Sequence, residues 1–402
     1  MTAYVVRRTA GEHPLWQRHG LVFGSLDIEL TERCNNDCMH CYICLPEHDE
    51  EARRREMSTA EVQALLTEAA ALGALSVRLT GGEPLLRGDF EELYLFARRS
   101  GLKVTLFTNA RGVTPQIAEL LARVPPLRPV EVTVYGMSAA TYERATRRRG
   151  SYDEFRRGVK LLQESGVPFV VKAALLPGMA GEVAEFEEWA ATLPAMDGPP
   201  NYSMFFDLRG RRDSERRNET IRGLRLSPAD GVRFLTRDRK RYVKQLREFC
   251  AKFTRPPGDE LFSCGAGLGA CVDAYGIVQP CMGLRAPETV VPLRNETGGE
   301  GGAGSVAAFD ATRLRYALTE AFPRLREMRA TNPEYLRRCA RCFLKGLCEQ
   351  CPAKSWAESG TLDTPVEYLC EVAHEQARDL GMLEPGEHGW EIEDWKGRVE
   401  RI

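Results

Sequence analysis

The stretch 34-CNNDCMHC-41 places three cysteines directly after the run 25-SLDIEL-30, in which polar and apolar residues alternate. The alternation predicts a β-strand, so the cysteines are expected on the loop at its carboxyl end. Their spacing, C-x3-C-x2-C, offers three thiolates, whereas a structural zinc site needs four ligands. Short cysteine spacings also hold iron–sulfur clusters. Three thiolates on a four-iron cluster would leave one iron open to a substrate or cofactor.

The composition is that of an ordinary globular enzyme: of 402 residues, 43% are hydrophobic and 28% are charged. The formal net charge of −2 gives no general attraction to nucleic acids or to anionic membranes. No run approaches the roughly 18 apolar residues of a membrane span. The N-terminal sequence MTAYVVRRTAGEHPLWQRHG lacks the apolar core of a secretory signal. These features predict a cytoplasmic protein with no nucleic acid and no membrane as its partner.

Thirteen cysteines are many for such a chain, and the odd number argues against a complete disulfide framework. In a reducing compartment, clustered thiols more often bind metal or do redox chemistry than form bridges. The cysteines fall into two groups, separated by a gap from residue 45 to residue 249. Cys250 has no cysteine at a matched spacing and is expected to be a small core residue.

Expected strands and expected helices alternate from residue 25 to residue 208. The expected strands are 25–30, 76–80, 103–108, 131–135, 169–175 and 202–208. The expected helices between them are 58–73, 89–101 and 153–166. This rhythm predicts an α/β fold with a parallel sheet and outer helices, either doubly wound or all or part of a barrel. In a barrel of this kind, chemistry takes place on loops at the carboxyl ends of the strands.

The stretch 80-TGGEP-84 follows the second expected strand. Together with the cysteine triple, it resembles the motifs of the radical S-adenosylmethionine (SAM) enzymes, which hold the methionine amino group of SAM with a glycine–glycine–glutamate segment. The resemblance implies that Cys34, Cys38 and Cys41 bind a [4Fe–4S] cluster. Gly81 and Gly82 would let the backbone approach a ligand closely, and Glu83, followed by Pro84, would accept hydrogen bonds from the ammonium.

The same resemblance implies further contacts to SAM. Thr108 and Asn109, at the end of the third expected strand, match the position that contacts the ribose or the methionine moiety. Tyr135 and Lys172 are further candidates, and His40 takes the position before the third cysteine that is often aromatic. Cys44 is expected to be spare, because a fourth thiolate would fill the open iron. A zinc site completed by Cys44 or His40 is the alternative for this loop.

The second cysteine group reads 264-CGAGLGACVDAYGIVQPC-281, 339-CARCFLKGLCEQC-351 and Cys370. This pattern resembles the SPASM extension of radical SAM enzymes, which binds auxiliary [4Fe–4S] clusters. The resemblance assigns Cys264, Cys271, Cys281 and Cys351 to one cluster. It assigns Cys339, Cys342, Cys348 and Cys370 to the other. The family more often has three residues between the last two cysteines of the central motif, where this chain has Glu349 and Gln350. A zinc ribbon is the alternative for this segment.

The resemblance implies a partial (β/α)6 TIM-like barrel, the radical SAM core, followed by a cysteine-rich SPASM domain. The predicted divisions are an N-terminal extension (1–23), the core (24–210), a helical connector (211–254), the SPASM domain (255–372) and a C-terminal tail (373–402). The implied cofactors are SAM and three [4Fe–4S] clusters, one SAM-binding and two auxiliary. The tryptophans near the end of the tail are expected to pack on the barrel.

The resemblance implies that the enzyme cleaves SAM reductively to a 5′-deoxyadenosyl radical. This radical would then abstract hydrogen from a peptide or protein. The favoured interpretation is a ribosomal peptide maturase that forms a thioether or carbon–carbon crosslink. It would need an electron donor such as flavodoxin or ferredoxin, and a separate leader-binding protein could serve it. Candidate leader surfaces are 144-RATRRRGSY-152 and 384-EPGEHGWEIEDWKGRVERI-402.

Three alternatives remain open at this point. One is a dehydrogenation like that of the sulfatase maturases, which usually carry an aspartate after the cysteine that matches Cys281. This chain has Met282 there, which disfavours that activity. Another is the tailoring of a tetrapyrrole or other small molecule. The third is a non-catalytic iron–sulfur or zinc scaffold, which 80-TGGEP-84 argues against, because a scaffold needs no SAM site.

Overall fold

A computed structural model describes residues 23–253, 257–294, 308–345, 347–348 and 351–399, without the side chains of 249–253. The chain divides into two compact units that are interleaved along the sequence. The sheet unit comprises Met1–Ser203, Ala266–Met282 and Thr289–Phe322. The helical unit comprises Met204–Gly265, Gly283–Glu288 and Pro323–Ile402. The domain boundaries given above remain predictions.

The sheet unit is built on one sheet of nine strands, in the order β11-β10-β9-β1-β4-β5-β6-β7-β8. Its six consecutive parallel strands are β1 (Ser25–Thr31), β4 (Ser76–Gly81), β5 (Lys103–Thr108), β6 (Val130–Val134), β7 (Phe169–Ala174) and β8 (Asn201–Ser203). Each neighbour in space is also the next parallel strand of the rhythm predicted from the sequence. The predicted α/β fold with a parallel sheet is confirmed.

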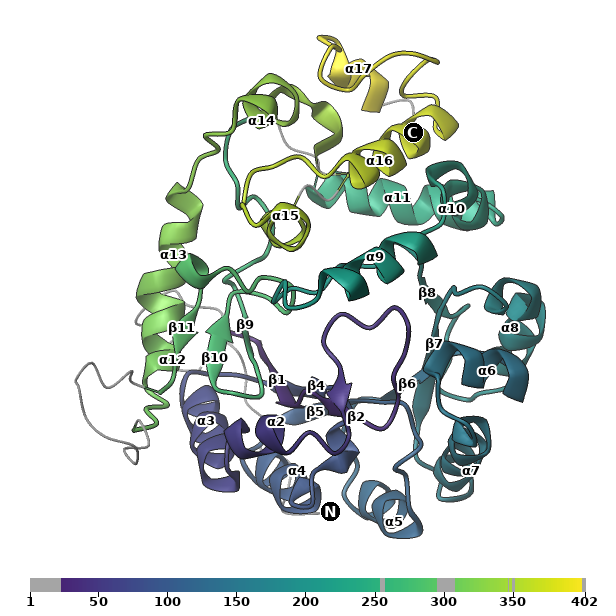
Figure 1. Ribbon diagram of the computed structural model, residues 1–402, viewed down its shortest axis with the longest axis vertical. Helices are drawn as coiled ribbons and strands as arrows, with labels where there is room; N and C mark the ends of the chain where they lie inside the picture. The colour runs from purple at the N-terminus through teal and green to yellow at the C-terminus, as the bar shows by residue number, and fades with distance from the viewer. Residues whose placement is uncertain (1–22, 254–256, 295–307, 346, 349–350, 400–402) are drawn as a thin grey trace. The chain divides into compact units, whose positions relative to one another are not determined.

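Helices connect these strands and follow the outside of the sheet (Figure 1). They are α2 (Glu50–Arg55), α3 (Thr59–Ala71), α4 (Phe90–Arg99), α5 (Pro115–Arg123), α6 (Ala139–Thr146), α7 (Ser151–Glu164) and α8 (Val183–Ala191). A capping box of Ser58 and Glu61 opens α3. Helices α2, α5, α6 and α8 were not predicted, although α5 and α6 each begin at an N-cap hydroxyl, Thr114 or Ser138.

The sheet has one apolar face and one polar face because side chains alternate along each strand. The apolar face is fully buried and includes Ile28, Leu79 and Leu106. On the other face, Asp27 lies in register with Arg78, and Phe107 lies in register with Glu131. These side chains are half-buried.

Three short strands continue the sheet beyond β1: β9 (Ala270–Val272), β10 (Ile277–Gln279) and β11 (Val291–Pro292). Strand β9 pairs in parallel with β1, and β10 pairs antiparallel with both β9 and β11. The turn between β9 and β10 needs a left-handed residue, which Gly276 supplies with a φ of 83°. Strand β9, which carries Cys271, therefore lies beside β1, the strand that precedes the first cysteine loop.

The helical unit contains α9 (Glu215–Leu224), α10 (Pro228–Leu235), α11 (Arg239–Phe253), α14 (Pro333–Arg337), α15 (Pro352–Ser359), α16 (Glu367–Asp379) and α17 (Trp395–Val399). The short helices α12 (Arg313–Tyr316) and α13 (Phe322–Arg324) precede α14 in the chain. Helices α9, α10 and α11 occupy most of residues 215–253. No helix among the described residues is long and apolar enough to cross a membrane.

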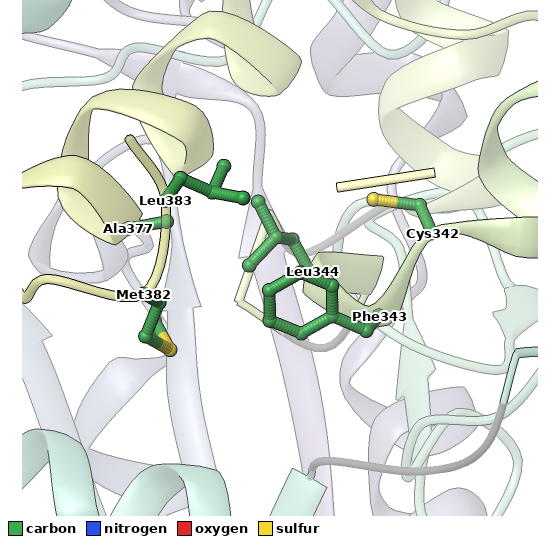
Figure 2. Packing of buried hydrophobic residues seen from close by; sticks show 6 residues of the cluster. All are labelled: Cys342, Phe343, Leu344, Ala377, Met382 and Leu383. Carbon is green, nitrogen blue, oxygen red and sulfur yellow. The ribbon is translucent and has the colours of Figure 1, made fainter. Parts of the chain in front are cut away.

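A small apolar core in the helical unit joins the central cysteine segment to the end of the chain. Figure 2 shows its six buried residues: Cys342, Phe343, Leu344, Ala377, Met382 and Leu383. Trp390 and Trp395 pack against this core. The tail tryptophans, which the sequence favoured as packing on the barrel, thus lie against the cysteine-rich segment of their own unit.

Candidate active site

The first cysteine loop starts at the carboxyl end of β1 and is closed by a two-stranded ribbon of β2 (Arg33–Cys34) and β3 (Leu45–Pro46). Its tip is tied to α6: the Asp37 N–H donates to Thr146 O (2.9 Å), and the Met39 N–H donates to Ala145 O (3.2 Å). Arg147, from the arginine-rich stretch, also donates to the Asp37 carboxylate (2.9 Å). The loop is therefore fixed at its base by the sheet and at its tip by a helix.

The thiols of this loop lie in an environment that favours a positively charged partner. Cys34 and Cys38 are buried, and Cys41 is half-buried. Burial raises the pKa of Cys34 well above its usual value, and the nearby Cys38, Glu83 and Cys41 raise that pKa further. Three thiolates in this place would repel one another unless a metal or cluster neutralised them.

Backbone and side-chain N–H groups point at two of these sulfurs. The Asn36 N–H donates to Cys34 Sγ (3.4 Å), and the Cys44 N–H donates to Cys41 Sγ (3.3 Å). Asn109 Nδ2 lies 3.8 Å from Cys34 Sγ. Hydrogen bonds to sulfur are among the means by which proteins tune iron–sulfur clusters. The donor set of this loop therefore fits a cluster held by thiolates.

No group of three or more His, Cys, Asp or Glu side chains within the described ranges is arranged to hold a metal ion. A four-iron cluster binds each thiolate through a different iron, so its ligands need not converge on one point.

Glu83 is fully buried at the carboxyl end of β4 and is held by three donors. Thr108 Oγ1 donates to Oε1 (2.8 Å), the Asn109 N–H donates to Oε2 (2.8 Å), and the Leu85 N–H donates to Oε1 (3.2 Å). Burial raises the pKa of Glu83 to about 7, although these hydrogen bonds by themselves lower the pKa. The carboxylate is thus oriented and desolvated, and an ammonium group would stabilise its charged form.

The two glycines before Glu83 face backbone. Gly81 has a φ of 122°, and a Cβ on it would lie 2.2 Å from Thr31 O. A Cβ on Gly82 would lie 2.2 Å from Arg33 O. The Glu83 N–H donates to this same Arg33 carbonyl (2.9 Å). The glycines therefore let the end of β4 lie directly on the start of the cysteine loop, while their predicted approach to a ligand remains a prediction.

Arg111, which the sequence analysis missed, braces the cysteine loop from the end of β5. Its guanidinium donates to the Asn36 side-chain oxygen (2.7 Å) and to the Asn35 carbonyl, and it pairs with Glu154 (2.6 Å). The Asn109 side chain donates to Asn35 Oδ1 (2.7 Å). The position of Arg111 in the sequence could have revealed this role, because Arg111 follows Asn109 by two residues on a loop at the carboxyl end of a strand.

The remaining candidates divide between this site and the polar face of the sheet. His40 and Tyr135 are ring neighbours, with centroids 5.8 Å apart. Burial raises the pKa of Tyr135, and so do the Cys38 and Cys34 thiols nearby. Lys172 lies mid-strand on β7, where its ammonium contacts Glu131 (3.1 Å) and lies 3.4 Å from the centroid of the Phe107 ring. Its described contacts are therefore on the polar face of the sheet.

Four cysteines of the second group line one pocket in the helical unit. Cys339, Cys342, Cys348 and Cys370 share it with Leu344, Lys345, His374 and Trp390. These are the four thiols that the resemblance assigned to one auxiliary cluster. Burial raises the pKa of Cys339 to about 11 and that of Cys342 to about 12. The Arg338 guanidinium donates to Cys370 Sγ (3.4 Å). Its positive charge acts against burial and lowers the pKa of both Cys339 and Cys342.

The other predicted set is divided between the units. Cys271, buried on β9, and Cys281 belong to the sheet unit. Cys264 and Cys351 belong to the helical unit. Met282, which takes the place of an aspartate, has its sulfur 3.8 Å from Arg78 Nη1. The ligands of this set remain a prediction.

Comparisons with known proteins agree with this arrangement. Residues 28–191 match the model of the radical SAM superfamily. A relative named AdoMet-dependent heme synthase, from Methanosarcina barkeri (strain Fusaro / DSM 804), is 27% identical over 356 residues, which cover 83% of this chain and 92% of the relative. The PqqA peptide cyclase of Xanthomonas euvesicatoria pv. vesicatoria (strain 85-10) is 34% identical over 177 residues, 42% of this chain and 45% of the cyclase.

A solved structure shares the fold. It is Streptococcus suis SuiB bound to the precursor peptide SuiA, with a TM-score of 0.58 and 18% identity, covering 88% of this chain and 78% of SuiB. The chain spans less than half the length of the cyclase that it matches. The matched family model begins in β1, includes the cysteine loop and Glu83, and ends in α8. The chain is therefore an enzyme that contains a radical SAM domain.

Proposed function

We propose that this enzyme binds SAM beside the Cys34–Cys41 loop and abstracts a hydrogen atom from a peptide, as a maturase that forms a thioether or carbon–carbon crosslink. The observation that carries the proposal is the placement of Glu83. The Glu83 carboxylate is buried and oriented by hydrogen bonds, and the Glu83 N–H is bonded to the backbone at the start of the loop that carries the three cysteines. A site for an amino acid ammonium next to a cluster needs these two parts.

In this proposal, Cys34, Cys38 and Cys41 hold a [4Fe–4S] cluster with one iron open. When bound, the cluster supplies the electron that cleaves SAM to methionine and a 5′-deoxyadenosyl radical. Glu83 holds the ammonium of the methionine moiety, and Thr108 and Asn109 keep the carboxylate oriented toward it. The rest of the SAM molecule would bind next to His40, Tyr135 and the backbone around Gly81, Gly82 and Pro84. Lys172 is a further candidate from the polar face of the sheet.

Two auxiliary [4Fe–4S] clusters complete the proposed cofactor set. Cys339, Cys342, Cys348 and Cys370 would hold one of them, which their common pocket supports. Cys264, Cys271, Cys281 and Cys351 would hold the other. A cytoplasmic flavodoxin or ferredoxin would supply electrons, and a separate protein could present the leader of the substrate.

The peptide substrate is supported by the relatives. The match to the PqqA peptide cyclase is 34% identical over 177 residues. A second candidate, modification of a tetrapyrrole, is favoured by the near-complete overlap with the AdoMet-dependent heme synthase. A dehydrogenation like that of the sulfatase maturases is disfavoured, because the sulfur of Met282 cannot act as a general base in the place of an aspartate.

The experiment is an anaerobic assay of the reconstituted enzyme with dithionite and SAM. We expect 5′-deoxyadenosine from the wild type and none from the Cys34→Ala, Cys38→Ala and Cys41→Ala triple variant. Mass spectrometry would then follow two substrates, a precursor peptide encoded beside the gene and an iron porphyrin. A crosslinked peptide, with loss of two hydrogens, supports the maturase. A modified porphyrin and an unchanged peptide would establish the second candidate instead.

A further inference from the structure

The final described segment of the chain, residues 384–399, which we call the tail segment, lies against the pocket of Cys339, Cys342, Cys348 and Cys370. Trp390 of the tail segment is one of the residues that line this pocket. Trp390, Ile392, Trp395 and Val399 pack on the apolar core that includes Cys342. This end of the chain lies outside the part that resembles the SPASM extension, so the family pattern assigns it no role.

A histidine joins the tail segment to the helix that carries Cys370. The ring of His374 on α16 lies between two backbone groups: Nδ1 is 2.7 Å from Cys370 O, and the Gly389 N–H donates to Nε2 (3.0 Å). A carbonyl only accepts and an amide N–H only donates, so the ring is neutral, with its proton on Nδ1. Both ring nitrogens are used, and His374 acts as a bridge between Cys370 and Gly389.

Gly389 lies directly on a sulfur. A Cβ at this position would be 2.7 Å from Cys342 Sγ and 2.8 Å from Leu344 Cγ. The Gly389 carbonyl in turn accepts from the Phe343 N–H (3.3 Å). The backbone of the tail segment therefore covers the side of Cys342, and a larger residue would have to push the two apart.

An aromatic and cationic layer continues this cover. The rings of His388 and Trp390 stack with centroids 4.4 Å apart, and the Arg338 guanidinium carbon lies 4.7 Å from the centroid of the Trp390 ring. Arg338 also donates to Cys370 Sγ (3.4 Å) and pairs with Glu367 (2.6 Å). One guanidinium thus connects a pocket thiol with the tail segment.

We propose that the tail segment is a cap that shields the auxiliary cluster of this pocket from water and oxygen, with His374 and Trp390 as its positioning residues. The inference rests on the proposed ligand set of Cys339, Cys342, Cys348 and Cys370. Groups around a cluster control solvent access and ligand orientation, and losing one such partner commonly costs about 10- to 100-fold in metal affinity or activity. The cap would give this cluster a protected environment that the chain itself provides.

The test uses the full chain with Cys34→Ala, Cys38→Ala and Cys41→Ala, so that only auxiliary clusters contribute to the visible absorbance. The parent and its variants are reconstituted anaerobically and exposed to air, and the loss of absorbance is followed. The phase that is missing in a further Cys370→Ala variant reports the pocket cluster. In Trp390→Ala and His374→Ala, we expect that phase to be about tenfold faster. Glu393→Ala, an exposed change in the tail segment, should match the parent.

Conservative variants separate the cap from a folding defect. Trp390→Phe keeps an aromatic wall, and His374→Gln keeps a side chain that can donate and accept, so both should bleach within about twofold of the parent. An unchanged phase in both alanine variants would overturn the cap and leave the ligand set intact. If Cys342→Ala and Cys370→Ala retain all the iron of the parent, the ligand set itself is wrong, and the cap falls with it.

Discussion

The Cys34–Cys41 loop and the Cys339–Cys370 pocket each gather thiols, but they are enclosed in different ways. The loop is braced by backbone hydrogen bonds to α6 at its tip and by Arg111, which donates to the Asn35 carbonyl and to the Asn36 side chain. In the pocket, a cation, Arg338, contacts a sulfur directly, and Trp390 forms part of the wall. The loop has a buried carboxylate beside it, whereas the pocket lining contains no acidic side chain among the described residues.

This difference matches two proposed tasks. A cluster that must bind a cofactor needs a free coordination position and a nearby group that recognises the cofactor, and Glu83 can supply that group. A cluster that only transfers electrons gains from four thiolates and a closed surface. We therefore expect substitutions in the two places to separate SAM cleavage from the properties of the auxiliary cluster.

The largest expected effect separates the sites by deleting one thiol from each. Cys38→Ala and Cys342→Ala should each lower the iron content by about four from a total of about twelve. Only Cys38→Ala should abolish 5′-deoxyadenosine formation with dithionite, because the pocket cluster is not needed to deliver an electron from that reductant. Iron analysis and chromatography of the products measure both. Equal loss of SAM cleavage in the two variants would contradict the division of tasks.

The next effect concerns the carboxylate that only the loop possesses. Glu83→Gln keeps the shape of the side chain but removes its charge, and loss of a buried charged partner costs about 2–5 kcal/mol. We expect SAM affinity, measured by calorimetry on the reconstituted enzyme, to fall accordingly while the iron content stays at the wild-type level. Glu154→Gln, which removes a half-exposed carboxylate that pairs with Arg111, is the matched control and should change SAM affinity far less.

The pH dependence of SAM binding provides a smaller effect at the same residue. Burial raises the pKa of Glu83 to about 7 in the absence of SAM, so below this pH the carboxyl must lose a proton before it can pair with the ammonium. Affinity should therefore weaken by about tenfold per pH unit below 7 and level off above it. Without SAM, the stability of the protein should instead fall as pH rises. The neutral Glu83 carboxyl makes its full contribution to the free energy of unfolding below its unfolded pKa, and this contribution is lost as pH rises through about 7. A Glu83→Gln variant with the same pH profile as the wild type would disprove this assignment.

The sequence predicted the parts of both sites that depend on local order. Glu83, Thr108 and Asn109 follow strands that are neighbours in a parallel sheet, so a motif at each strand end was enough to expect them together. The common pocket of Cys339, Cys342, Cys348 and Cys370 agrees with the grouping that the family pattern implied.

The parts that the sequence did not predict depend on contacts between distant segments. Arg338 reaches Cys370, and Gly389 reaches Cys342, across 32 and 47 positions of the chain. No short spacing marks such pairs, and a glycine in a tail of mixed composition has no local signal of its own. The pairing of β9 with β1 was also missed, because a strand of three residues is too short to show alternation.

The smallest effect compares the two arginines that brace the sites. Arg338→Gln removes a positive charge that touches a pocket sulfur, and an interaction that differs by about 1.4 kcal/mol between redox states would shift a one-electron potential by about 59 mV. Removing the cation favours the less negative oxidised cluster, so the potential should fall. Arg111→Gln removes a charge that reaches the loop only through Asn35 and Asn36, so we expect poorer assembly of the first cluster with a smaller change in potential. Potentiometric titration followed by electron paramagnetic resonance measures both, and a larger shift in Arg111→Gln would mean that the loop, not the pocket, is the site tuned by direct charge.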